Sequence, residues 1–236
     1  FNAFAPLPYH EALYNIAEHF NLELLGVVSE AYALSRSFGK GDDNLSAVFI
    51  DVGGGSTDIA IVHEGALMGT KMFGIGGRTF TKRLAVELNI SFREAEKLKL
   101  AYTAEQLEPK SKKLISDILQ ADIEVWLEGI VLAFSEFSQL KELPPKILLI
   151  GGGSHLPEIK EALTNRKWYK KLHFPAKPQI TFMKPADLPD ILDMTKKVHD
   201  PQNITPAALV NAAMELAGEE SLLQKILRKV IGIMQV

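Results

Sequence analysis

Asp51-Val52-Gly53-Gly54-Gly55-Ser56-Thr57-Asp58 joins two apolar, β-branched segments, 45–51 and 57–63, in a chain of 236 residues. Segments of this kind predict strands. Because glycine has no Cβ, the triplet can adopt positive φ, turn its N–H groups into one concavity and let a phosphate approach closely. The stretch therefore predicts an anion cradle between two strands, with a carboxylate at each end.

The carboxylates and hydroxyls of this stretch suggest further ligands. Mg²⁺ keeps several waters and takes only one or two protein carboxylates, so Asp51 is a candidate metal ligand and a candidate catalytic residue. Ser56 and Thr57 could add hydroxyl donors to a phosphate. The alternative is a tight β-hairpin whose aspartates only cap the turn. The two flanking carboxylates and the strand on each side favour the phosphate interpretation.

The surrounding segments predict an antiparallel meander followed by helices. A third strand is expected at 66–73, and only Glu64-Gly65 separates it from the second, which is too short for a crossover helix. Ser91 and Glu94 form a capping box, and Thr205 is a candidate N-cap of the last helix. Further strands are expected at 146–150 and 179–183, and helices at 10–20, 30–38, after Gly77, from Ser91 to Tyr102, at 110–140, up to Leu163 and at 207–217. We expect an α/β fold with a mixed sheet flanked by helices.

A second glycine turn, Gly151-Gly152-Gly153, lies between a predicted strand and a helix, where a helix N-terminus can face an anion. The dinucleotide fingerprint is absent because Leu156 occupies the place of its third glycine, and no Gly-Lys-Ser/Thr follows. A close strand-to-helix turn explains this triplet alone equally well. Two triplets that each follow a buried strand are more informative than either one.

The composition excludes several classes of function. Lys and Arg number 26 against 29 Asp and Glu, and a net charge of -3 gives no basic surface for a phosphate backbone, so no nucleic acid partner is expected. The absence of cysteine excludes disulfides and thiolate metal sites and fits a cytoplasmic protein. No apolar run reaches the roughly 18 to 20 residues that span a bilayer, so membrane contact would be peripheral.

Three segments resemble the second half of an actin-like ATPase domain, and in particular the FtsA family of bacterial cell-division proteins. They are AVFIDVGGGSTDIAIV at 47–62, GTKMFGIGGRTFTKRLAVELNISFREAEKLKL at 69–100 and KILLIGGGSHLPEIKEAL at 146–163. The resemblance implies the ribonuclease H-like fold of actin-like ATPases, with ATP and Mg²⁺ as cofactors. Catalysis, where present, would be phosphoryl transfer to water.

The resemblance also implies which residues bind the nucleotide. Residues 51–57 match the second phosphate motif, near the β- and γ-phosphates and magnesium, and 151–153 match the adenosine motif. Glu96 and Lys99 lie three residues apart on one helical face and match residues that reach the ribose and adenine; a solvated ion pair is the alternative. The expected cofactor-binding residues are Gly53, Gly54, Gly55, Ser56, Thr57, Gly76, Gly77, Glu96, Lys99, Gly151, Gly152 and Gly153.

Other parts of the chain depart from the family pattern. Residues 27–33 resemble the first connecting motif, with Ala31 in place of proline, and Glu30 is a second candidate catalytic residue; a helix-starting carboxylate explains Glu30 equally well. Asn211 replaces a glycine of the second connecting helix. The resemblance also implies a first phosphate motif, an Asp-x-Gly hairpin, which would lie before Phe1. We expect either that the N-terminal half has been lost or that this chain does not hydrolyse ATP by itself, and the agreement among the retained elements favours truncation.

The last stretch, 222–235, has the pattern of an amphipathic helix. Lys225, Arg228 and Lys229 all lie on its polar side. Such a helix can bury its apolar face among acyl chains while its cations meet anionic headgroups, as the resemblance also implies. The alternative is a helix that docks on its own domain or on a partner.

The sequence thus predicts two domains: the second half of an actin-like nucleotide-binding domain at 1–217 and a basic amphipathic helix at 218–236. The expected function is that of an FtsA-type, ATP-binding protein that self-associates into filaments, joins division proteins and lies on the inner face of the cell membrane. A slow Mg²⁺-dependent ATPase is compatible with this. The alternatives are a small-molecule kinase of the same superfamily and a pilus-assembly adaptor of the PilM type.

Overall fold

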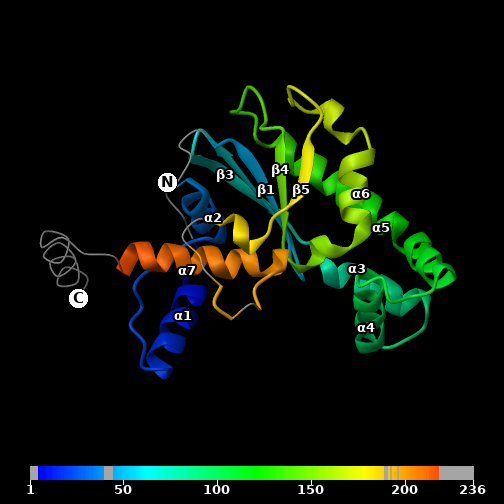
Figure 1. Cartoon of the computed structure of the whole chain (residues 1–236), viewed down its shortest axis with the longest axis horizontal. Helices are drawn as coiled ribbons and strands as arrows, with labels where there is room; N and C mark the ends of the chain where they lie inside the picture. Colours follow the sequence, from blue (N-terminus) through cyan, green and yellow to red (C-terminus); the bar gives the residue numbers. More distant parts are fainter. Residues whose placement is uncertain (1–4, 40–44, 189–190, 192, 196, 218–236) are drawn as a thin grey trace, which may run out of the picture.

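A single five-stranded sheet forms the centre of the molecule (Figure 1). The computed structural model describes residues 5–39, 45–188, 191, 193–195 and 197–217, so the expected helix at 222–235 lies outside the described residues. The sheet has the order β3-β2-β1-β4-β5, and its strands are β1 (Ala47–Val52), β2 (Thr57–His63), β3 (Ala66–Phe73), β4 (Lys146–Ile150) and β5 (Gln179–Phe182). The first three strands pair antiparallel, whereas β4 runs parallel to both β1 and β5. The predicted mixed sheet with an antiparallel meander is confirmed.

The β2–β3 connection has the geometry that a two-residue hairpin requires. Glu64 and Gly65 adopt φ values of 48° and 73°. Positive φ at both central residues gives a backbone twist that matches the twist of the flanking strands. A short turn therefore closes the meander, as its sequence predicts.

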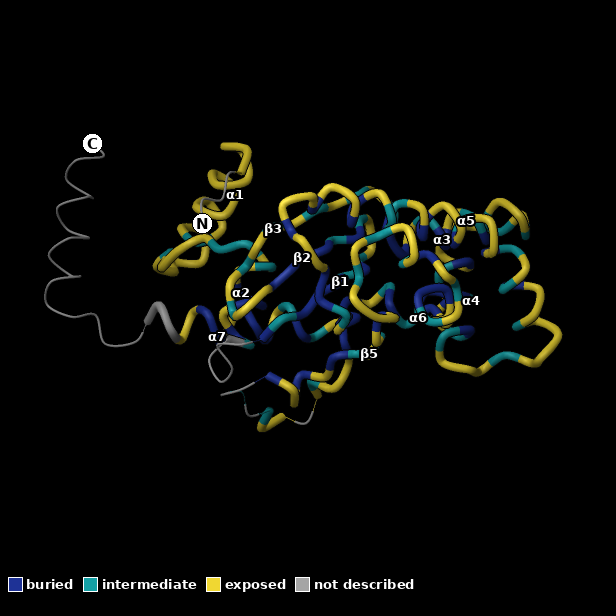
Figure 2. The backbone as a smooth tube through the Cα atoms, turned by 90° about the horizontal axis from the view of Figure 1, so that it is seen from above, coloured by how far each residue is buried: buried dark blue, intermediate teal, exposed yellow. Residues whose placement is uncertain are grey.

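The sheet is covered by helices on both faces because its central strands are apolar on both sides. Along β1, Val48 and Ile50 face one core, whereas Ala47 and Phe49 face a second core. This alternation follows from the two-residue period of a strand. Figure 2 shows the buried strands between the two groups of helices. The result is a three-layer α/β/α arrangement.

The first core lies between the sheet and a group of four helices. These are α3 (Gly77–Glu87), α4 (Phe92–Thr103), α5 (Pro109–Ser135) and α6 (Pro157–Asn165). Both hydrogen bonds of the capping box predicted at Ser91 and Glu94 are present at the start of α4. The prediction that α5 reaches residue 140 is wrong. Phe137 and Leu140 are buried from a turn after the helix, so their spacing reflects core packing rather than helix.

The second core is covered by α2 (Glu30–Gly39) and α7 (Ile204–Ala217), which lie side by side on the opposite face (Figures 1 and 2). The N-terminal helix α1 (Leu7–His19) buries none of its residues and extends away from the sheet. Within the described ranges, none of the helices has the length and apolar character needed to cross a bilayer.

Candidate functional site

The first glycine turn, 53–55, leads from β1 into β2 at one end of the sheet. The prediction that these glycines use positive φ is wrong, because Gly65 and Gly151 alone among the glycines of the described residues do so. A Cβ at Gly53, Gly54 or Gly55 would meet no atom closer than 3.4 Å, so close packing does not exclude side chains from this turn. The backbone of the turn instead accepts hydrogen bonds from the start of α3. Gly77 N donates to Gly53 O over 2.9 Å, and Arg78 N donates to Gly54 O over 2.7 Å. The start of α3 is thereby attached to this turn by two backbone hydrogen bonds.

The second glycine turn packs directly onto the first. A Cβ on Gly153 would lie 2.7 Å from Val52 Cγ1 and 3.0 Å from Gly53 O. Gly151 has a φ of 81°, and a Cβ there would lie 2.1 Å from Asp51 Oδ1. Side chains at Gly151 and Gly153 are therefore excluded by contact with β1 and the turn after it. The two triplets, about a hundred residues apart in the sequence, form one junction.

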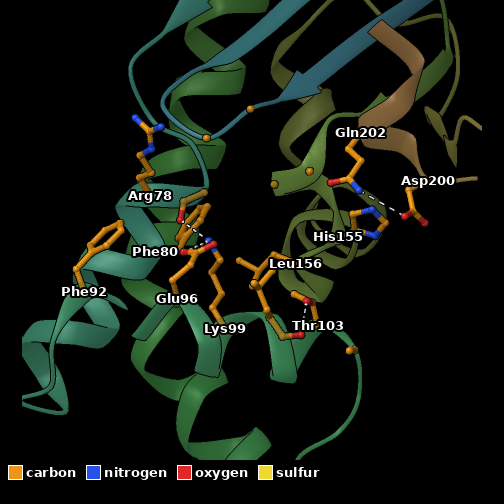
Figure 3. A pocket seen from close by; sticks show the side chains of 17 residues that line it. Arg78, Phe80, Phe92, Glu96, Lys99, Thr103, His155, Leu156, Asp200 and Gln202 are labelled. Carbon is orange, nitrogen blue, oxygen red and sulfur yellow. Dashed lines mark hydrogen bonds and ion pairs between the residues drawn. The ribbon is translucent and has the colours of Figure 1, made fainter. Parts of the chain in front are cut away.

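A cavity of about 650 Å³ opens beside this junction. Its walls come from the two glycine turns, the start of α3, one face of α4 and the segment before α7. Figure 3 shows Glu96 and Lys99 of α4 beside the cavity, with His155 and Gln202 on another side. The structure thus brings together seven of the predicted cofactor-binding residues: Gly53, Gly54, Gly77, Glu96, Lys99, Gly152 and Gly153.

Several lining residues were not found by sequence reasoning. The largest polar ones are Arg78, His155, Asp200 and Gln202 (Figure 3). Arg78 directly follows a glycine pair, which is a signal that could have been used. Gln202 lies in the short 3-10 helix Pro201–Asn203 and Asp200 is its N-cap. Neither belongs to a sequence motif, so only the tertiary structure reveals them. The remaining lining residues are largely apolar: Phe80, Phe92, Leu100, Thr103, Ala104 and Leu156.

Lys99 is held by three partners at the floor of the cavity. Its Nζ donates to Gly77 O (2.9 Å), Thr81 Oγ1 (2.8 Å) and Glu96 Oε2 (2.9 Å). Thr81 also donates to Glu96. Burial alone would raise the pKa of Glu96, but these hydrogen bonds and the charges of Lys99 and Arg78 lower it below its ordinary value. Glu96 is therefore an ionised carboxylate at the cavity wall at neutral pH.

Other predicted residues lie near the cavity without lining it. Ser56 Oγ donates to Asp58 Oδ2 over 2.9 Å. Thr57 is fully buried, and its hydroxyl donates to Ile75 O over 2.7 Å. Gly76 is covered by the first glycine turn, since a Cβ there would lie 2.7 Å from Gly53 O. Gly55 and Gly151 are likewise absent from the cavity lining.

The two candidate catalytic residues line a second, smaller cavity of about 260 Å³, on the α2 and α7 side of the sheet. Glu30, Asp51 and Asp58 all contribute to it. Burial raises the pKa of each of the three carboxyls, and the charges of Asp51 and Asp58 raise that of Glu30 further. In the described part of the chain, no group of three or more His, Asp or Glu side chains has the arrangement of a metal site.

Thr205 holds Asp51 in place, and the prediction that Thr205 caps α7 is wrong. The helix begins at Ile204, so Thr205 lies within its first turn. Its Oγ1 donates to Asp51 Oδ2 over 2.9 Å, which lowers the pKa of Asp51 against the effect of burial. The Thr205 hydroxyl, which the local sequence predicts to cap the helix, therefore bonds to a distant carboxylate instead.

Comparison with solved structures identifies the class of fold. The type IV pilus biogenesis complex PilM-PilN matches with a TM-score of 0.57 at 15% identity, covering 77% of this chain and 50% of that one. The ethanolamine utilization protein EutJ from Carboxydothermus hydrogenoformans matches with a TM-score of 0.55 at 22% identity, covering 84% and 58%. The fold is that of the actin-like ATPases.

Sequence comparison identifies the family. The family model of the cell division protein FtsA matches residues 48–212, and the chain belongs to that family. FtsA of Bacillus subtilis is 28% identical over 167 residues, covering 62% of this chain and 38% of the relative. FtsA of Enterococcus hirae is 30% identical over 138 residues, covering 50% and 31%. The chain thus spans less than two fifths of the length of these relatives.

Proposed function

We propose that the cavity between the glycine turns binds an adenine nucleotide. The observation that carries this proposal is that both triplets and the Glu96–Lys99 face of α4 meet around one space. Its volume of about 650 Å³ lies within the roughly 300–1,000 Å³ of small-molecule sites. The glycine backbones would contact the phosphates, where side chains would block close approach. The apolar wall at Leu100 and Leu156 would receive the base.

Magnesium would be held by Asp51, through water. The second oxygen of this carboxylate accepts the Thr205 hydrogen bond, so Oδ1 remains for a metal-bound water. A site with one carboxylate and several waters agrees with the preference of Mg²⁺. Asp51 lines the smaller cavity, whereas Gly53, two residues later, lines the nucleotide cavity. An ion held between them would neutralise phosphate charge. We propose Glu30 as the residue that orients the attacking water, because it lines the same small cavity as Asp51.

A pair of substitutions in one turn tests nucleotide binding. Gly54 lines the cavity, and a Cβ there meets nothing closer than Arg78 Nε at 3.6 Å, so Gly54→Val fills the phosphate region without displacing the backbone. Gly55 does not line the cavity and has nothing within 4 Å of its Cβ position. Calorimetry with ATP and Mg²⁺ should show binding by the wild type and Gly55→Val and at least tenfold weaker binding by Gly54→Val. Equal affinities would contradict the assignment.

At the cellular level we propose an FtsA-type role, in which the nucleotide biases self-association and contacts with division proteins. Membership of the FtsA family supports this role. Contact with the membrane is assigned to residues 222–235, from their amphipathic pattern and three clustered cations. Changing Lys225, Arg228 and Lys229 to Glu should release the protein from anionic liposomes in a flotation assay. Unchanged flotation would instead favour a helix that docks on protein.

A further inference from the structure

We propose that Trp126 and Thr57 are positioning residues. From within the core they fix the shape of the first glycine turn, 53–55, which would contact the phosphates. Trp126 of α5 is fully buried and donates from Nε1 to Thr57 Oγ1 over 2.9 Å. Thr57 in turn donates to the carbonyl oxygen of Ile75 over 2.7 Å. We call these two hydrogen bonds the Trp126–Thr57–Ile75 relay. The inference rests on the proposed nucleotide site and assigns it residues that never touch the ligand.

The donor and acceptor groups of the relay fix the direction of both hydrogen bonds. An indole N–H can only donate, and a backbone carbonyl can only accept. The Thr57 hydroxyl must therefore accept from Trp126 and donate its single proton to Ile75 O. Because Thr57 is also fully buried, its hydroxyl has no proton left to donate to a ligand. Thr57 serves the site through the backbone that it holds rather than through contact with a phosphate.

The relay ends at the Ile75–Gly76 peptide, which leads into α3. The carbonyl of Ile75 lies in the same rigid peptide plane as the N–H of Gly76. The next two amides, of Gly77 and Arg78, donate to Gly53 O and Gly54 O. Fixing the Ile75 carbonyl therefore fixes the direction of the chain that secures the first glycine turn. The relay thus connects α5, through Thr57 of β2, to the backbone beside the cavity.

The second tryptophan provides an internal comparison. Trp168 is also buried, and its Nε1 donates to Leu163 O over 3.0 Å. That bond spans only five residues and lies outside the cavity lining, whereas the Trp126 bond joins residues 69 positions apart. Tryptophan-to-phenylalanine changes at the two positions therefore remove similar bonds with different expected effects on the site.

Conservative variants test the relay. Thr57→Val has nearly the shape of threonine but breaks both hydrogen bonds, whereas Thr57→Ser keeps the hydroxyl. Trp126→Phe removes the donor. Thr164→Val on α6 and Trp168→Phe are the matched controls, since Thr164 bonds only to Lys160 O within its own helix. The readouts are ATP affinity by calorimetry with Mg²⁺ and hydrogen exchange of the Gly77 and Arg78 amides without nucleotide.

We expect Thr57→Val and Trp126→Phe to bind ATP about tenfold more weakly and to exchange these two amides about tenfold faster, while the amides of β4 stay unchanged. Thr57→Ser and both controls should stay within about twofold of the wild type. If the Gly77 and Arg78 amides of Thr57→Val and Trp126→Phe exchange at the wild-type rate, the proposed relay is refuted. It is also refuted if Trp168→Phe raises these exchange rates by the same factor.

The two proposals fail in different ways. A wild-type chain that does not bind ATP refutes the nucleotide site, and the exchange rates then still decide whether the relay holds the turn. If the wild type binds ATP and the relay variants bind it equally well, the positioning role is refuted while the nucleotide site stands. Rescue by Thr57→Ser would support a role of the hydroxyl itself over one of packing volume.

Discussion

Thr205 Oγ1 lies 2.9 Å from Asp51 Oδ2, and this hydrogen bond joins residues 154 positions apart in the sequence. It connects the first turn of α7 to the last residues of β1. On its other side, Asp51 lies against Gly151, where a Cβ would come within 2.1 Å of Oδ1. The carboxylate that the sequence marks as a metal ligand is therefore held between two distant segments.

Removing the Thr205 hydroxyl should loosen this arrangement. Thr205→Val leaves the largely buried Asp51 carboxylate without its hydrogen-bond donor, so we expect the free energy of unfolding to fall by about 1–2 kcal/mol. The pKa of Asp51 should rise further, because the bond that lowers it is lost. Thr205→Ser keeps the donor and is the control. Urea unfolding at neutral pH measures the difference, and equal stability of the valine and serine variants would contradict this prediction.

Adjacent glycines of the second triplet should respond very differently to alanine. Gly151 has positive φ and no room for a Cβ, which would lie 2.1 Å from Asp51 Oδ1 and 2.6 Å from Val52 O. At Gly152 the nearest atom to a Cβ is Gln202 Oε1 at 3.5 Å. We expect Gly151→Ala to lower stability by at least about 3 kcal/mol and Gly152→Ala by less than about 1 kcal/mol. Thermal unfolding of the two variants gives the comparison, and similar melting temperatures would count against it.

Sequence reasoning identified the parts of the fold that local pattern determines. The strands 57–63, 66–73 and 146–150 have the predicted bounds, because short apolar runs between turn residues leave little freedom. The end of α5 was misplaced because Phe137 and Leu140 continue the apolar spacing of the helix after the helix has ended. The spacing of apolar residues indicates which residues are buried, and here buried residues continue into the turn after the helix.

The candidate site was predictable only where it carries a motif. Both glycine turns and the Glu96–Lys99 pair were found from their spacing and from the family resemblance. Arg78, His155, Asp200 and Gln202 reach the same cavity without any such pattern. The first triplet also differs from its prediction: none of its glycines has positive φ, and two of its carbonyls accept hydrogen bonds from the start of α3. Contacts between distant segments determine these features, and a local pattern does not encode them.

The carboxyls of the smaller cavity make a contribution to stability that falls as pH rises, because their pKa values are raised. Burial raises the pKa of Asp58 above 3.8, its ordinary value, so the folded protein holds this proton more tightly than the unfolded chain does. Below the ordinary value both states are protonated and the penalty is absent. As pH rises from there through the raised pKa, the folded state loses stability relative to the unfolded state, and the full penalty then remains at neutral pH.

Asp58→Asn should remove this penalty. We expect the variant to be more stable than the wild type at pH 7 by about 0.5–1 kcal/mol, with the advantage disappearing near pH 3.5. The asparagine side chain can still accept the hydrogen bond from Ser56. Asp117→Asn, on an exposed position of α5, is the control and should show no comparable gain. Urea unfolding at several pH values measures the effect, and a pH-independent difference would exclude titration of Asp58 as its cause.

A substitution at Lys99 can distinguish a residue that binds the nucleotide from one that stabilises the fold. Its ammonium group already has a partner for each of its three protons, at Gly77 O, Thr81 Oγ1 and Glu96 Oε2, and the residue is 9% exposed. Lys99→Met keeps most of the aliphatic stem but removes the ion pair and hydrogen bond that Lys99 makes with Glu96. Because hydrogen bonds to charged groups contribute about 1.5–3 kcal/mol, we expect a loss of about 2 kcal/mol in unfolding free energy without any nucleotide.

Lys97→Met, on the exposed side of the same helix, is the matched control and should change stability by less than about 0.5 kcal/mol. Urea unfolding of the nucleotide-free protein measures both variants. A residue that acted only on the nucleotide would leave nucleotide-free stability intact and would lower ATP affinity alone. That outcome would contradict a structural role of Lys99. Loss of both stability and ATP affinity would mean that Lys99 joins α4 to the first turn of α3 and thereby shapes the wall against which the nucleotide is proposed to bind.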